Sequence, residues 1–189
     1  MNPISGTTNK AGIPELIAKT LDTNTFDYEI RLTEHAGHAF EIATEAKDNG
    51  VDVVVAVGGD GTVNEVARAI VHSNTALGII PCGSGNGLAR HLMIPMQLKK
   101  AIEVINEYQI HDLDYGIINE HPFFCTCGMG FDAFVSMKFA EAGKRGPITY
   151  AFFPNSVLLS SYSCFSPKMI PGTQSCIPGT VSFFSNIIH

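Results

Sequence analysis

The sequence has little of what membrane-spanning or nucleic-acid-binding proteins require. No apolar run approaches the length needed to cross a bilayer, and the first residues do not form the charged-then-apolar segment of a secretion signal. The 189 residues include 12 Lys and Arg against 18 Asp and Glu, and this net charge of −6 does not indicate a broad basic surface for nucleic acid or anionic lipid. We therefore expect a cytoplasmic protein without a nucleic-acid partner, peripheral at the membrane if its substrate is a lipid.

Cysteine patterns typical of metal sites or disulfides are also lacking. The five cysteines are odd in number and show no paired metal-ligand spacing. Cys125 and Cys127 alternate within a predicted strand, which places both thiols on one face. We interpret the cysteines as core residues of a protein in a reducing compartment. The hydrophobic content of 45% can fill a core, and the length allows one domain, or one domain and part of another.

A strand followed by a glycine turn is the feature around which the chain is organised. Residues 53–57 are an unbroken apolar run rich in β-branched side chains, which predicts a parallel strand buried on both faces. Gly58, Gly59 and Gly61 follow, and they allow the backbone to turn sharply and to approach a ligand closely.

A helix is predicted directly after this turn. Thr62 and Glu65 have the T-x-x-E spacing of a capping box, so we expect the helix to begin there. One apolar stripe at helical spacing follows: Val63, Val66, Ala67, Ile70 and Val71. A helix that begins behind a glycine loop, at the end of a parallel strand, is a ready anion site.

Asp60 makes this loop more specific than glycine alone. A carboxylate would repel a phosphate unless a divalent cation lies between them, or unless the carboxylate takes a proton from an attacking hydroxyl. No Lys follows the glycines, so the loop is not a Walker A loop. The alternative, a plain strand-to-helix turn with Asp60 facing water, is the weaker interpretation of the whole string G-G-D-G-T-x-N-E.

A second glycine loop follows the next strand. Residues 76–80 predict a short buried strand that Pro81 stops, and residues 83–87 (Gly-Ser-Gly-Asn-Gly) lead into another helix. Ligands of open α/β sheets bind at such strand ends, where backbone N–H groups and the Ser84 hydroxyl can reach phosphate oxygens. Arg90, one helical turn on, either meets a phosphate or lies on a solvated helix face.

The remaining pattern predicts an α/β fold, a parallel sheet with flanking helices. Helices are expected over residues 14–21, 36–46 and 97–108, with Asn49 and Gly50 closing the second. Further strands are expected over residues 26–32, 112–118 and 122–127, the last two as a hairpin. His35 and His38 are interpreted as residues at a helix start rather than as catalytic groups.

Four ordered stretches resemble the diacylglycerol kinase catalytic domain family, which includes bacterial lipid kinases and sphingosine and ceramide kinases. They are residues 2–6 (N-P-I-S-G), 58–65 (G-G-D-G-T-V-N-E), 81–90 (P-C-G-S-G-N-G-L-A-R) and 128–133 (G-M-G-F-D-A), within roughly the first 150 residues. The resemblance to NAD kinases and phosphofructokinases is more distant. Gly87, where the family more commonly has Asp, is a weak hint of the sphingosine and ceramide kinase branch.

The resemblance implies a site for ATP and Mg²⁺. Asp60 would be the catalytic residue and would lie beside Mg²⁺, and Asp132 would lie on the substrate side, although a helix N-cap explains Asp132 equally well. The nucleotide-binding residues implied are Asn2, Pro3, Ser5, Gly6, Thr33, Gly58, Gly59, Asp60, Gly61, Thr62, Asn64, Glu65, Gly83, Ser84 and Asn86.

The resemblance also implies a domain organisation. Residues 1–127 would form a nucleotide-binding α/β domain, and residues 128–150 the start of a second, β-rich, lipid-binding domain. Residues 151–189 form an atypical tail without Asp or Glu and without a sustained helical or strand period. Because the family has a strand before N-P-x-S-G and further motifs after residue 150, we expect a chain truncated at both ends. The absence of an acid after Glu141 also argues against a dinucleotide fingerprint at residues 128–133.

The function that follows from the resemblance is transfer of the γ-phosphate of ATP to a lipid hydroxyl, of diacylglycerol or sphingoid type. Two alternatives stay open. One is an NAD-kinase-like small-molecule kinase, which the Asn64-Glu65 continuation and the second loop argue against. The other is a nucleotide-binding fragment without catalysis. The sequence specifies neither the lipid nor the oligomeric state.

Overall fold

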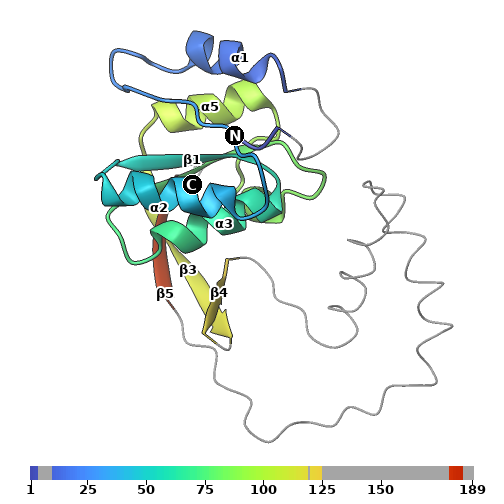
Figure 1. Cartoon of the computed structure of the whole chain (residues 1–189). Coiled ribbons are helices and arrows are strands. Elements are labelled where there is room, and N and C mark those ends of the chain that lie inside the picture. Colours follow the sequence, from blue (N-terminus) through green and yellow to red (C-terminus); the bar gives the residue numbers. More distant parts are fainter. Residues whose placement is uncertain (4–9, 119, 125–178, 185–189) are drawn as a thin grey trace, which may run out of the picture. The chain divides into compact units, whose positions relative to one another are not determined.

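The computed structural model describes residues 1–3, 10–118, 120–124 and 179–184. The chain divides into two units, one of Met1–Cys125 with Cys176–His189 and one of Thr126–Ser175, and every described element belongs to the first. The predicted α/β fold is confirmed, because a sheet with a parallel portion is flanked by helices (Figure 1). The predicted division into domains at residues 127 and 150 stays a prediction.

The sheet has five strands in the order β1-β2-β5-β3-β4. Their bounds are β1 Val53–Gly58, β2 Ala76–Pro81, β3 Ile110–Ile118, β4 His121–Phe123 and β5 Gly179–Phe184. β1 and β2 are parallel in the register Val53 to Ala76 and Gly58 to Pro81, and β2 pairs with β5 in parallel as well. β3 is antiparallel to β5 and to β4, so the predicted hairpin of β3 and β4 is confirmed.

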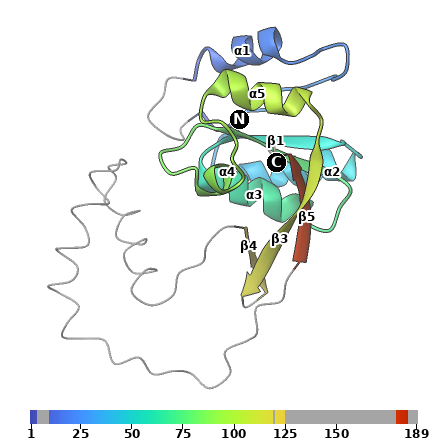
Figure 2. The same cartoon turned by 180° about the vertical axis from the view of Figure 1, so that it is seen from behind.

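Helices cover both faces of the sheet (Figures 1 and 2). On one face α3 (Asp60–Ile70) packs on β1 and β2, and α2 (His38–Asp48) packs on α3. On the other face α5 (Leu98–Asn106) packs on β2, and α1 (Ile13–Thr20) packs on α5. A further short helix, α4 (Gly87–His91), follows β2. Among the residues that the structure describes, no helix is both long and apolar enough to span a membrane.

Two apolar clusters hold these layers together, one on each face of β1 and β2. The α2 and α3 side buries Ala43, Ala67, Ile70, Ala56 and Leu77, among others. The α1 and α5 side buries Ile13, Ile17, Ile102, Ile105, Val57 and Ile80. Because neighbouring strand residues such as Ala56 and Val57 point to opposite clusters, the strands are buried on both faces, as the apolar run predicted.

Residues 26–32 are not a strand, contrary to the prediction from their alternation. Thr33 N–H donates to the Met1 carbonyl at 3.0 Å, and the Met1 amine donates to the Arg31 carbonyl at 2.5 Å. Met1 and Asn2 lie beside β1, since Asn2 N–H donates to the Val57 carbonyl at 3.0 Å. Contacts at one end of an extended segment do not form a ladder, and the side chains of Tyr28 and Leu32 are exposed.

The tail contributes an element that the sequence analysis did not predict. β5 comes from residues beyond 151, yet it lies between β2 and β3 in the sheet.

The predicted closure of α2 is confirmed, because Asn49 caps its C-terminus and Gly50 has a left-handed φ of 73°. The strand predicted over residues 122–127 and the Cys125–Cys127 alternation extend outside the described residues.

Candidate active site

The two glycine loops meet backbone to backbone at the carboxyl ends of β1 and β2. Cys82 N–H donates to the Gly58 carbonyl at 2.8 Å, which continues the strand pairing into the loops. A Cβ atom on Gly83 would lie 2.5 Å from the Cα of Gly59, and one on Gly59 would lie 3.1 Å from the Cα of Gly83. Glycine at position 83 is therefore required by a close approach of two backbones.

Asp60 joins the two loops through its side chain. It is the first residue of α3, and its carboxylate accepts the Asn86 N–H at 2.9 Å and the Gly87 N–H at 2.6 Å, one on each oxygen. A Cβ atom on Gly85 would lie 2.7 Å from the same carboxylate. Asp60 is nevertheless exposed as a residue, so the remaining lone pairs of its carboxylate stay open to a ligand.

Asn86 and Arg90 fix the shape of the second loop. Asn86 is buried with a φ of 53°; its Oδ1 accepts the Gly83 N–H and its Nδ2 donates to the Gly83 carbonyl, both at 2.8 Å. Arg90 Nε donates to the Gly85 carbonyl at 2.9 Å. Arg90 thus holds the loop backbone, a role that neither of its two predicted interpretations included.

The capping box predicted at the start of α3 is wrong. The helix begins at Asp60, two residues earlier than expected, with Gly59 as its N-cap and no side-chain capping bond. Thr62 is buried inside the first turn, where its Oγ1 accepts Asn2 Nδ2–H at 3.2 Å. The Glu65 carboxylate instead accepts the Gly37 and Ala39 N–H groups at 3.1 and 3.2 Å, so it caps α2 rather than its own helix.

Seven of the predicted nucleotide-binding residues converge at this point: Asn2, Gly58, Gly59, Asp60, Thr62, Gly83 and Asn86. Pro3, Gly61, Asn64 and Ser84 are exposed, while Thr33 is buried beside Met1. Ser5, Gly6 and Asp132 lie outside the described residues. The roles in nucleotide binding, catalysis and substrate binding that were predicted for all of these residues stay predictions.

A buried amine next to Asn2 was not foreseen. Lys10 is only 5% exposed, and its Nζ donates to the Asn2 carbonyl at 2.5 Å. Burial, then the charge of Lys10, lowers the pKa of the Met1 amine. Burial raises the pKa of the Cys82 thiol, and the charges of Lys10 and the Met1 amine oppose that rise in part. Cys82 is a buried free thiol in the α1 and α5 cluster, as the interpretation of the cysteines as core residues expected for this position.

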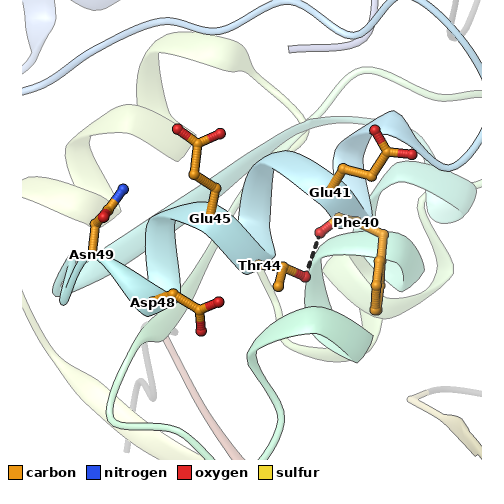
Figure 3. A pocket seen from close by; sticks show the side chains of 6 residues that line it. All are labelled: Phe40, Glu41, Thr44, Glu45, Asp48 and Asn49. Atoms are coloured by element: carbon orange, nitrogen blue, oxygen red, sulfur yellow. Dashed lines mark hydrogen bonds between the residues drawn. The ribbon is translucent and has the colours of Figure 1, made fainter.

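An open hollow of about 470 Å³ lies along α2 (Figure 3). It is lined by Phe40, Glu41, Thr44, Glu45, Asp48 and Asn49. Three of these six residues are carboxylates, and none belongs to a glycine loop. Because a phosphate would be repelled by that lining, the glycine loops, and not this hollow, are the candidate active site.

Known proteins match this chain in sequence. The model of the diacylglycerol kinase catalytic domain family matches residues 1–118. A protein named "Diacylglycerol kinase" from Staphylococcus saprophyticus is 36% identical over 154 residues, which are 79% of this chain and 50% of the relative. A protein named "Probable lipid kinase YegS" from Escherichia fergusonii is 35% identical over 105 residues, 53% of this chain and 35% of the relative.

The fold comparison agrees with these matches. The crystal structure of a diacylglycerol kinase from Bacillus anthracis strain Sterne matches with a TM-score of 0.55 and 26% identity, over 65% of this chain and 45% of that one. The chain thus spans half or less of the length of these relatives. The matched region holds both glycine loops and the residues that lock them together. On these grounds the chain belongs to the diacylglycerol kinase catalytic domain family.

Proposed function

We propose that this chain carries the nucleotide half of an ATP-dependent lipid kinase. The observation that carries the proposal is the junction of the two glycine loops, at which Asp60 accepts N–H groups of Asn86 and Gly87. The loops at the carboxyl ends of adjacent parallel strands are where open α/β proteins bind their ligands. The printed names of the relatives support the kinase class.

ATP would lie across residues 2–6, 58–65 and 83–86. The Cβ position of Gly61 is open, so no side chain keeps a phosphate away from the start of α3, and Ser84 is exposed where its hydroxyl can donate. Asn2 would hold the edge of the site, since it is bonded to Thr62 in the first turn of α3. The net charge of the chain is negative, so phosphate binding would depend on these local donors and on a cation.

The residues present fit Mg²⁺. Mg²⁺ sites in phosphoryl-transfer proteins use one or two carboxylates together with substrate phosphates and water. Asp60 offers such a carboxylate, because each of its oxygens accepts one N–H and keeps a second lone pair. When bound, Mg²⁺ would neutralise charge on the phosphates.

Asp60 would also receive the proton of the acceptor. The lipid hydroxyl oxygen would form a bond to the γ-phosphorus while the bond from that phosphorus to the β–γ bridging oxygen breaks, and ADP would leave. The hydroxyl proton would pass to the Asp60 carboxylate. Phosphoryl transfer depends mainly on positioning and charge neutralisation, and the bonds from Asn86 and Gly87 hold Asp60 for both.

The acceptor we propose is diacylglycerol or a sphingoid lipid, met at the membrane surface. The choice of diacylglycerol rests on the printed names of the relatives, and the sphingoid alternative rests on Gly87 in the second loop. A second, β-rich domain beginning near residue 128, with Asp132 on the substrate side, would complete the lipid site. Two rival functions remain: phosphorylation of NAD, and nucleotide binding without transfer to any acceptor.

Radiolabelled ATP offered with diacylglycerol, sphingosine or NAD, each with Mg²⁺, tests the proposal. Labelled lipid supports it, and labelled NAD would replace it with the small-molecule kinase. ATP binding by isothermal titration, with and without Mg²⁺, runs beside the assay. Binding without transfer would indicate a nucleotide-binding fragment, and absence of both would refute the nucleotide site in this chain.

A further inference from the structure

The turn that leads into α2 carries a group of metal-ligating side chains that the kinase site does not use. His35, His38 and Glu41 each offer a ligand atom, and these atoms all lie within 4.8 Å of one another. His38 is the first residue of α2, Glu41 lies one turn further along, and His35 precedes the helix. The two imidazole rings are stacked, with centroids 4.6 Å apart and an interplanar angle of 6°.

We propose that His35, His38 and Glu41 bind a divalent transition metal such as Zn²⁺. Two imidazoles and a carboxylate are a ligand set typical of Zn²⁺ and other first-row metals, with a water molecule as the fourth ligand. Two ligands on one tetrahedral Zn²⁺ lie about 3.3 Å apart. In the structure the two rings lie parallel, so their in-plane lone pairs do not point to one position. His35 and Glu41 are at the surface, and on binding His35 would turn out of the stack by a change of side-chain rotamer.

The tautomer of His35 suits this role. Its Nδ1 lies 3.0 Å from the Ala36 carbonyl, and a carbonyl can only accept, so Nδ1 carries the proton. The lone pair of the neutral ring is then on Nε2. A ligating histidine typically donates its other ring N–H to a backbone carbonyl or a carboxylate, and such a bond selects the tautomer.

His38 binds the metal at the cost of one hydrogen bond. Its Nδ1 accepts the Glu34 N–H at 3.1 Å, so the lone pair of this ring is on Nδ1. Ligation through Nδ1 exchanges the Glu34 bond for a metal bond at an exposed turn, where water can satisfy the released N–H. The amide of Glu34 therefore reports on ligation of His38.

The charges around the turn favour a cation, although the turn lies at the N-terminus of α2. The N-terminus of a helix carries a partial positive charge, which opposes cation binding. At α2 this charge is offset by the Glu65 carboxylate on the Gly37 and Ala39 N–H groups, and Glu41 adds a second carboxylate. A bound metal would fasten the turn after Thr33 to the first turn of α2.

Titration of the chain with Zn²⁺ at about pH 7.5, where an ordinary imidazole is mostly neutral, tests the proposal. We expect one equivalent to bind, and His35→Gln, His38→Gln and Glu41→Gln each to weaken binding by roughly tenfold or more. His91→Gln and Glu15→Gln, which change exposed residues outside the cluster, are the matched controls and should bind as the parent does.

Hydrogen exchange separates this cluster from adventitious binding. On adding Zn²⁺ the Glu34 amide should exchange faster, while the Gly37 and Ala39 amides keep their protection from Glu65. Absence of saturable binding would overturn the proposal. Binding that persists unchanged in His35→Gln and Glu41→Gln would overturn it as well, even if His38→Gln perturbs the helix start.

Discussion

The two glycine loops stand at equivalent places, after neighbouring parallel strands, yet they are held in different ways. The first loop leads into α3, an 11-residue helix whose buried face includes Val63, Val66 and Ile70. The second leads into α4, which has only five residues, and it is shaped by side-chain bonds from Asp60, Asn86 and Arg90. The first loop is therefore positioned by the packing of α3. The second loop is positioned largely by its bonds to Asp60, which belongs to the first turn of α3.

This difference assigns two tasks to Asp60. A carboxylate that only served chemistry would have no need to bond the backbone of another loop. Because Asp60 accepts two N–H groups from the second loop, the geometry of the proposed phosphate site depends on the same side chain that would act on the acceptor. A substitution that damages the junction should therefore disturb both loops. A substitution elsewhere in one loop should disturb that loop alone.

Damage to the backbone contact should have the largest effect. In Gly83→Ala the new Cβ lies 2.5 Å from the Cα of Gly59, and a backbone atom cannot rotate away. We expect a loss of about 3 kcal/mol in the free energy of unfolding and loss of ATP binding, measured by urea denaturation and titration. Gly61→Ala is the matched control, since nothing lies within 4 Å of a Cβ there; a helical alanine should leave stability unchanged or raise it by up to about 1 kcal/mol.

Removal of the Asp60 charge should weaken the bonds between the two loops without introducing a steric clash. In Asp60→Asn one oxygen remains to accept, so one of the Asn86 and Gly87 N–H groups loses its partner. We expect a loss of about 2 kcal/mol and faster exchange of at least one of these two amides, with the α3 amides unchanged. Asp52→Asn, at an exposed position before β1, should change neither. Equal exchange in Asp60→Asn and the parent would show that the carboxylate does not hold the second loop.

The cap of α2 should contribute less to the free energy of unfolding than the junction of the two loops does. Glu65→Gln loses a charge that interacts with the helix N-terminus, and it loses one of two acceptors for the Gly37 and Ala39 N–H groups. We expect a loss of about 1 kcal/mol in thermal or chemical unfolding. Glu45→Gln, which breaks only an exposed ion pair with Arg31, should cost about 0.5 kcal/mol or less. A larger effect in Glu45→Gln would contradict the assignment of Glu65 as the cap.

The smallest change concerns the link between the first loop and Asn2. Thr62→Val keeps the shape of a buried side chain and removes the Oγ1 that accepts Asn2 Nδ2–H at 3.2 Å. A loss of about 0.5–1 kcal/mol is expected in denaturation, with both loops still in place. Thr44→Val is a control, because its hydroxyl bonds only its own helix, at the Phe40 carbonyl. If ATP affinity fell in Thr44→Val as in Thr62→Val, the link to Asn2 would not be the cause.

The first loop could be predicted from the sequence because its signals are local. The apolar run, the three glycines and the helical stripe lie within 20 residues, and the structure has the strand, turn and helix that they predicted. The bonds of Asp60 and Glu65 could not be predicted, since their partners are 26 to 28 residues away. The capping-box spacing of Thr62 and Glu65 was misleading for the same reason: each side chain had a better partner outside its helix.

Sheet pairing was the other limit. Residues 26–32 alternate as a strand would, but alternation describes side chains, whereas a strand also needs a neighbour for its backbone. β5 was missed for the opposite reason, because its place between β2 and β3 is supplied by two distant strands rather than by a period in its own sequence. The burial of Lys10 gave no signal at all, since no sequence pattern marks a lysine as buried.

If the two loops form one nucleotide site, hydrogen exchange with and without ATP and Mg²⁺ should show it. We expect added nucleotide to protect the amides of residues 58–65 and 83–87 together, at the same nucleotide concentration. Protection of one loop alone, or protection along α2 at the acidic hollow, would contradict it.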